Sequence, residues 1–141
     1  MFGFAKTKPR RTDVAVEVAA KLIGVQLSLS DTRDNHQFEE RLGDLYSRGY
    51  IWGLCDALIQ SAGIEDGNEA WPLFKRAHVE LFGKEAGSMI VNQSLGEQND
   101  PLFHKGRALG GQEAFDFLNQ KIPPFGLAGY LLEGRHGFLS D

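Results

Sequence analysis

The chain has 141 residues, of which 42% are hydrophobic and 24% are charged, and its formal net charge is -4 at pH 7. This length corresponds to one domain, and the composition is that of an ordinary soluble globular protein. The acidic balance excludes a general nucleic-acid binder, which would carry a basic domain. The single cysteine excludes an internal disulfide framework and a multi-cysteine zinc site.

The two ends of the chain differ from its middle. Residues 1–11 carry four basic side chains and no acidic one, and we expect a flexible arm there, with contact to an anionic membrane surface as a weaker alternative. Asp13 and Glu17 follow directly, which does not fit a secretory signal. The sequence also contains no run of about 18 uncharged apolar residues, which a transmembrane helix would need. We therefore expect a cytoplasmic protein with one domain over 12–134 and a tail over 135–141.

The first predicted element is a helix that begins near Thr12. Apolar residues from Ala15 to Ile23 fall mainly on one helical face. Residues 25–30 instead alternate apolar and polar, which is the period of a strand. The sequence therefore leaves helix and strand open for this short stretch.

The longest predicted helix spans residues 35–62. Apolar residues from Phe38 to Ile59 recur at three, four or seven positions, which is close to heptad spacing. Gly63 fits the left-handed position just past a helix end, where Ile64 would pack on Ile59 in a Schellman motif. The spacing and the ending together predict one long central helix.

The remaining predicted helices are separated by polar starts and by glycine or proline stops. Asp66 or Asn68 caps a helix whose first turn holds Pro72, and a further helix covers 84–98. The next one begins at Asp100–Pro101 and ends at the glycine pair 110–111. Shorter helices follow over 112–122 and 125–133. The sequence thus predicts an all-α domain, a compact bundle of about five to seven helices.

Three side chains spaced four residues apart offer the first candidate site. His36, Glu40 and Asp44 would lie on neighbouring turns of the long helix, and all three are familiar ligands of divalent metals. Arginines flank this stripe, so a solvated, salt-bridged helix face explains the same pattern. No cofactor is predicted, because no sequence motif for one occurs.

A pocket between helices is the second candidate site, with an anion or a metal as its ligand. Basic and imidazole groups would provide the polar contacts, and the two tryptophans would form walls. Its residues are His78, His104, Lys105, Arg107, Trp52 and Trp71. The alternative for His78 is an ordinary core histidine, because it shares a face with apolar residues.

The apolar C-terminal region is the third candidate. It either closes the core of its own chain or forms an interface with a partner. The interface residues would be Phe117, Phe125, Leu127, Tyr130 and Leu131. No catalytic motif occurs, so we expect a helical domain that acts by protein–protein contact, as a homodimer or an accessory subunit, rather than an enzyme. A small-molecule binding protein or an enzyme with a pocket between helices is the alternative.

Overall fold

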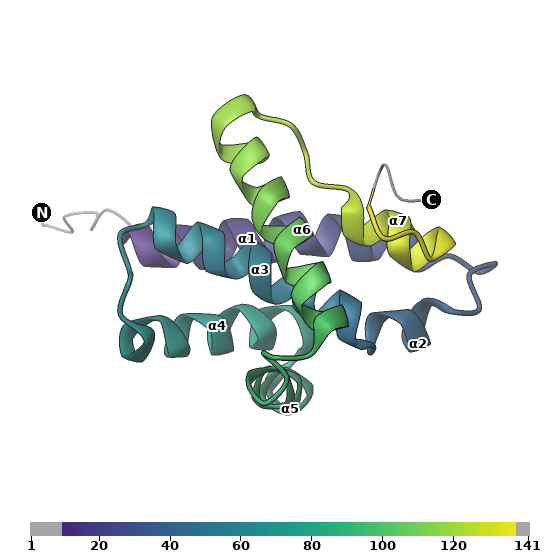
Figure 1. The fold of residues 1–141 in the computed structure, drawn as a ribbon, viewed down its shortest axis with the longest axis horizontal. Helices are drawn as coiled ribbons and strands as arrows, with labels where there is room; N and C mark the ends of the chain where they lie inside the picture. The colour runs from purple at the N-terminus through teal and green to yellow at the C-terminus, as the bar shows by residue number, and fades with distance from the viewer. Residues whose placement is uncertain (1–9, 138–141) are drawn as a thin grey trace, which may run out of the picture.

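The computed structural model describes residues 10–137, which form helices and no strands (Figure 1). The all-α prediction is therefore confirmed. The helices are α1 (Arg11–Ser30), α2 (Phe38–Leu42), α3 (Leu45–Ser61), α4 (Gly67–Phe82), α5 (Lys84–Leu95), α6 (Pro101–Gln120) and α7 (Gly126–Glu133). Most of the expected basic arm and the end of the expected tail lie outside the described residues.

Helix α3 is the centre of the fold. Every residue from Tyr46 to Cys55 is buried, and α3 contacts α1, α4 and α6 (Figure 1). Helix α6 crosses α3 steeply, and its C-terminal end projects beyond the other helices before the chain returns to α7. Among the described residues, no helix combines the length and the apolar character needed to cross a bilayer.

Four glycines allow the crossing of α3 and α6. A Cβ atom at Gly110 would lie 2.2 Å from the carbonyl oxygen of Tyr50, and one at Gly49, Gly53 or Gly106 would lie 2.0 to 2.1 Å from another backbone oxygen. Any side chain would force the two backbones apart. The prediction that the glycine pair 110–111 ends a helix is wrong, because Gly110 is a contact residue within the continuous helix α6.

The long helix predicted over 35–62 is also wrong in one respect, because it is broken at residues 43–44. Gly43 ends α2, and Asp44 adopts an extended conformation and caps α3, with its Oδ1 accepting a hydrogen bond from the Ser47 N–H at 3.3 Å. A capping carboxylate stabilises a helix start, and this cap competes with continuation of the helix. The apolar spacing therefore runs across two helices.

The predicted ending of this segment is confirmed in detail. Gly63 has φ of +93°, and its N–H donates to the Gln60 carbonyl at 2.9 Å. The N–H of Ile64 donates to the Ile59 carbonyl at 3.4 Å, which completes the Schellman motif. The predicted start at Asp100 is confirmed as well, since its carboxylate accepts from two N–H groups of the first turn of α6.

Two further details of the helices resolve or correct predictions. Residues 25–30 are helical and complete α1. Asp66 caps α4 by accepting from the Asn68 N–H at 2.8 Å, so α4 begins at Gly67 and Pro72 lies in its interior rather than in its first turn. Proline lacks an N–H, so this position removes one backbone hydrogen bond of α4.

Candidate functional site

A buried polar network holds α7 against the rest of the fold. The Tyr50 hydroxyl donates to Glu113 Oε1 at 2.5 Å and accepts from Gln26 Nε2 at 3.1 Å. The same two side chains accept the first N–H groups of α7: Gly126 donates to Glu113 Oε1 at 2.9 Å, and Ala128 donates to Gln26 Oε1 at 3.0 Å. Burial, and then the charge of Glu113, raise the pKa of Tyr50 well above its ordinary value. The hydroxyl therefore stays protonated and remains a donor.

The other end of α7 is held by a second group of polar contacts. Asn35 Nδ2 and Arg41 Nη1 donate to the Leu131 carbonyl at 2.9 and 3.2 Å. The Tyr130 hydroxyl donates to the carboxylate of Asp44, the same residue that caps α3. Both ends of this eight-residue helix are thus fixed by side chains from other elements.

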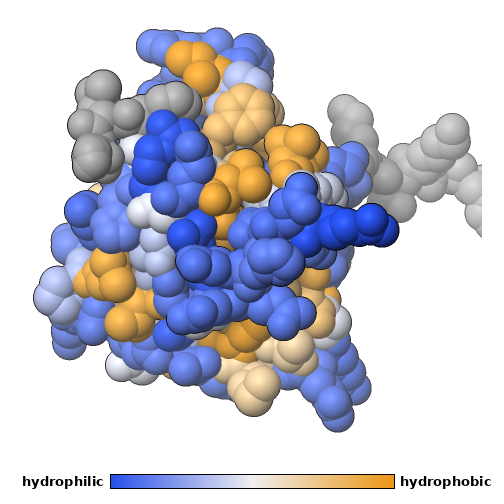
Figure 2. Space-filling model, turned by 90° about the vertical axis from the view of Figure 1, so that its right-hand side faces the viewer, coloured by the Kyte–Doolittle hydropathy of each residue, from blue (hydrophilic) through white to orange (hydrophobic). Residues whose placement is uncertain are grey.

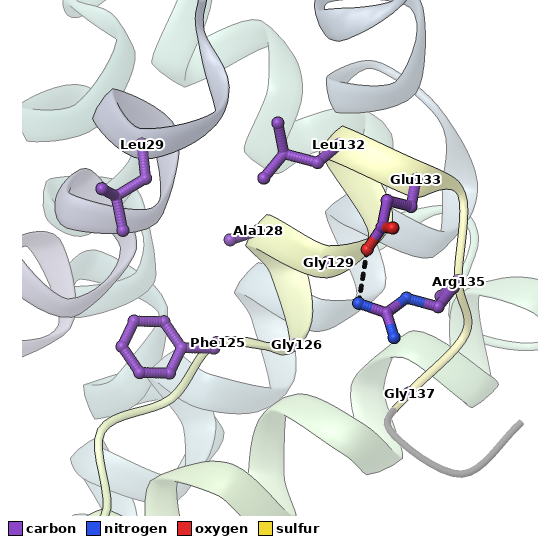
Figure 3. A pocket seen from close by; sticks show the side chains of 9 residues that line it. All are labelled: Leu29, Phe125, Gly126, Ala128, Gly129, Leu132, Glu133, Arg135 and Gly137. Atoms are coloured by element: carbon purple, nitrogen blue, oxygen red, sulfur yellow. Dashed lines mark hydrogen bonds and ion pairs between the residues drawn. The ribbon is translucent and has the colours of Figure 1, made fainter.

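An apolar groove of about 340 Å³ lies between the C-terminal end of α1 and helix α7. The side chains of Leu29, Phe125 and Leu132 gather around it, together with the methyl group of Ala128 (Figure 3). Leu29 is 52% exposed, and Phe125 and Leu132 are each 43% exposed. Glu133 and Arg135 form an ion pair at the C-terminal end of α7, on the side away from Leu29 and Phe125 (Figure 3). The two charged residues form the polar margin of the groove.

The groove continues along α1 as a line of apolar side chains, which we call the α1 stripe. Its spacing of four, four, three and four residues places the members on one helix face. All of them are exposed or half-buried. The α1 stripe consists of Val14, Val18, Leu22, Val25 and Leu29.

A second apolar recess, of about 330 Å³, lies at the N-terminal end of the α1 stripe. Val14 and Val18 line it from α1, and Phe117 and Leu118 line it from the projecting end of α6. The α1 stripe therefore has an apolar recess at each end. Figure 2, viewed from the α7 end, shows exposed apolar side chains in a band near the top of this face, among polar ones.

No family model, curated protein or solved structure matches this chain. The roles of its residues therefore follow from their own geometry. The α1 stripe joins two apolar recesses along one helix face, and it is the candidate site.

The residues predicted to form an anion pocket do not converge. Trp52 and Trp71 do line one recess, but none of the four predicted polar residues lines it with them. His104 and Lys105 are exposed on α6, and Arg107 Nη1 donates to Gln98 Oε1 at 2.9 Å. Since α6 is continuous from Pro101 to Gln120, no helix begins after the glycine pair 110–111 to bind an anion with free N–H groups.

His78 is the fourth predicted polar residue, and it is a core residue. Its side chain is fully buried, and its Nδ1 lies 2.7 Å from the Phe74 carbonyl oxygen. The Nε2 atom is buried and has no hydrogen-bond partner within residues 10–137. Burial lowers the pKa of His78, so the imidazole is neutral at neutral pH.

The predicted metal site does not form. His36 lies in the turn before α2, Glu40 is exposed on α2, and Asp44 caps α3, so the three residues do not share a helix. Within residues 10–137, no group of three or more His, Cys, Asp or Glu side chains could hold a metal ion. The break at Gly43 removes the four-residue periodicity on which the prediction depended.

The predicted interface residues of the C-terminal region fall into two groups, one in the core of the chain and one that lines the surface recesses. Leu127, Tyr130 and Leu131 are buried and close the core of their own chain, so they do not form a surface. Phe117 is half-buried and Phe125 is exposed, and each lines one of the two recesses. The missed residues of the site belong to α1, where Val25 and Leu29 fit the period of a strand as well as a helix.

Proposed function

We propose that this chain acts by protein–protein contact and that its α1 stripe binds a second copy of the chain. The observation that carries the proposal is the α1 stripe itself, an apolar helix face with an apolar recess at each end. Monomeric proteins rarely expose a continuous apolar surface of this kind, whereas isolated apolar side chains on a surface are ordinary.

The spacing of the α1 stripe favours another helix as its occupant. From Val18 to Leu29 the steps are four, three and four residues, which is the alternation found in the seam of a coiled coil. A facing helix with the same spacing places its side chains between those of the first. Helix α1 of a second copy has this spacing by definition.

The positions of the recesses favour an antiparallel pair. One recess lies at each end of the α1 stripe, so a twofold axis near Leu22 brings the groove beside α7 of one copy opposite the recess beside α6 of the other. Most homodimers are closed by such a twofold axis, with the same surface on both subunits. The arrangement buries the two recesses of each copy in one contact.

The test is sedimentation velocity of the full chain over a range of concentrations. We expect a dimer for the unmodified chain and a monomer for Val25→Asp, because each dimer would bury two unpaired carboxylates in the seam. Met89→Asp is the matched control: it places the same charge at an exposed apolar position on α5, 66% exposed against 55% for Val25. This control should remain a dimer.

Circular dichroism of all three chains checks that each retains its helices. An unmodified chain that sediments as a monomer up to about 100 µM would contradict self-association, since a stable dimer has a Kd well below that value. A Val25→Asp chain that dimerises as tightly as Met89→Asp would contradict the assignment of the contact to α1.

A further inference from the structure

A recess of about 440 Å³ between α3 and the first half of α4 has aromatic walls. Trp52 stacks on Phe74 with ring centroids 4.3 Å apart and an interplanar angle of 22°. Phe103 makes an edge-to-face contact with Trp52, with ring centroids 6.3 Å apart and an interplanar angle of 61°. The half-buried Trp71 lines the recess from α4. The aromatic groups are therefore held by packing, and the recess does not depend on a mobile side chain.

The charged residues that line this recess are both acidic. They are Asp56, one turn after Trp52 on α3, and Glu65, in the connector before α4. Asp56 Oδ2 accepts from Gln60 Nε2 at 3.1 Å, and neither carboxylate forms an ion pair within the described part of the chain. Arg107 lines the neighbouring recess that shares these carboxylates, but it donates to Gln98.

We propose that this recess binds an organic ammonium cation, such as a quaternary amine or a methylated amino group. The faces of aromatic rings attract such cations, and tryptophan does so most strongly. The two carboxylates add favourable charge without the crowded oxygen ligands that a bare metal ion requires. An anionic ligand would be repelled, and the positive end of α4 beside the recess is already capped by Asp66.

This site is independent of the proposed self-association. It is built from α3, α4 and their connector, whereas the α1 stripe involves α1, α6 and α7. A chain that does not dimerise can still bind the cation, and a dimer can lack this site. The two proposals therefore fail separately.

Intrinsic fluorescence is a direct probe, because the two tryptophans of the chain both line this recess. The titrant is choline, and the matched control titrant is its uncharged isostere with carbon in place of the quaternary nitrogen. We expect choline to change the tryptophan emission with saturation in the millimolar range, and the isostere to have at least tenfold lower affinity.

Substitutions then identify the groups responsible. The double variant Asp56→Asn with Glu65→Gln keeps the shape of the recess, and we expect it to bind choline about tenfold more weakly, because two partly solvated carboxylates are lost. The control is Glu39→Gln, which removes an exposed carboxylate from α2 and should leave the affinity unchanged. Trp71→Leu, with Trp52 as the remaining reporter, should weaken binding by a similar factor.

Each other outcome overturns the proposal. Absence of any saturable change with choline would exclude the site. Equal affinity for choline and its isostere would show an apolar recess that does not recognise charge. Equal choline affinity of the double carboxylate variant and Glu39→Gln, with both chains folded by circular dichroism, would remove the assigned role of the carboxylates.

Discussion

Replacement of Gly110 by alanine tests the account of the α3–α6 crossing. The added Cβ would lie 2.2 Å from the Tyr50 carbonyl oxygen and 3.0 Å from the Leu54 nitrogen, both of which are backbone atoms of α3. Backbone atoms cannot rotate away as a side chain can. The adjacent Gly111 supplies the matched control, because a Cβ there meets nothing closer than an oxygen at 3.7 Å.

The expected magnitude follows from these distances. Ordinary contact begins at 3.4 Å, so the two helices must separate by about 1 Å at Gly110, and a gap of that size removes roughly a quarter to a half of the dispersion energy across it. Overpacking of this kind costs about 1–3 kcal/mol, and the better helix propensity of alanine returns up to about 1 kcal/mol. We expect Gly110→Ala to lower the free energy of unfolding by about 2 kcal/mol and Gly111→Ala to raise it by about 0.5 kcal/mol.

Urea unfolding followed by helical circular dichroism measures both variants, at one fixed protein concentration because association would add to the stability. An unchanged m-value shows that a shift in midpoint reports stability alone. Equal urea midpoints for Gly110→Ala and Gly111→Ala would show that the close approach of the two backbones does not constrain the fold.

Three further predictions concern buried polar groups. Tyr50→Phe should lower the free energy of unfolding by about 1–3 kcal/mol, because Glu113 loses a buried donor; an unchanged urea midpoint would contradict this. The pKa of His78 is lowered by burial, so the unfolded chain takes up a proton first, and stability should fall as the pH drops below 6.5. His78→Gln should flatten this part of the stability–pH curve; a curve equal to that of the unmodified chain would refute the assignment. Burial raises the pKa of Cys55 to about 12, so a thiol reagent at neutral pH should label it only in urea; rapid labelling of the native chain would show that it is accessible.

The helix end at Gly63 and the helix start at Asp100 were predictable, because the groups that determine them are neighbours in the sequence. The Schellman ending at Gly63 needs only a glycine, a carbonyl three residues back and an apolar residue after it. The start at Asp100 needs only a short carboxylate before Pro101. In both cases the local sequence is enough to determine where the helix ends or begins.

Whether a helix breaks or continues inside the apolar pattern was less predictable, because contacts with distant parts of the chain contribute to it. Gly110 and Gly111 form an ordinary stop signal when they are considered alone, and only the crossing with α3 makes Gly110 a contact residue. The break at Asp44 is similar. Its carboxylate caps α3 and also accepts from Tyr130, a partner 86 residues away that no local pattern reveals.

The recess with aromatic walls was predictable only in part. Trp52 and Trp71 were expected to be walls of one pocket, and they do line one. The charge of that pocket was not predictable, because basic residues were the ones that clustered in the sequence. The two carboxylates come from the end of α3 and from the connector, and the turn at Gly63 brings Glu65 to the same recess as Asp56.

We expect the groove to form late in folding, because a network of side chains from other helices holds α7 in place. An eight-residue helix has little stability of its own in water, and the first N–H groups of α7 find their acceptors on Gln26 and Glu113, on two different helices. Gln26 and Ala128 are 102 residues apart, so this contact closes one of the longest loops in the chain. Local release of α7 would abolish the groove and leave the α3–α6 crossing intact. A partner bound beside α7 would therefore slow backbone hydrogen exchange in α7 before it does so in the other helices. Only chains in which α7 has docked would be able to bind such a partner.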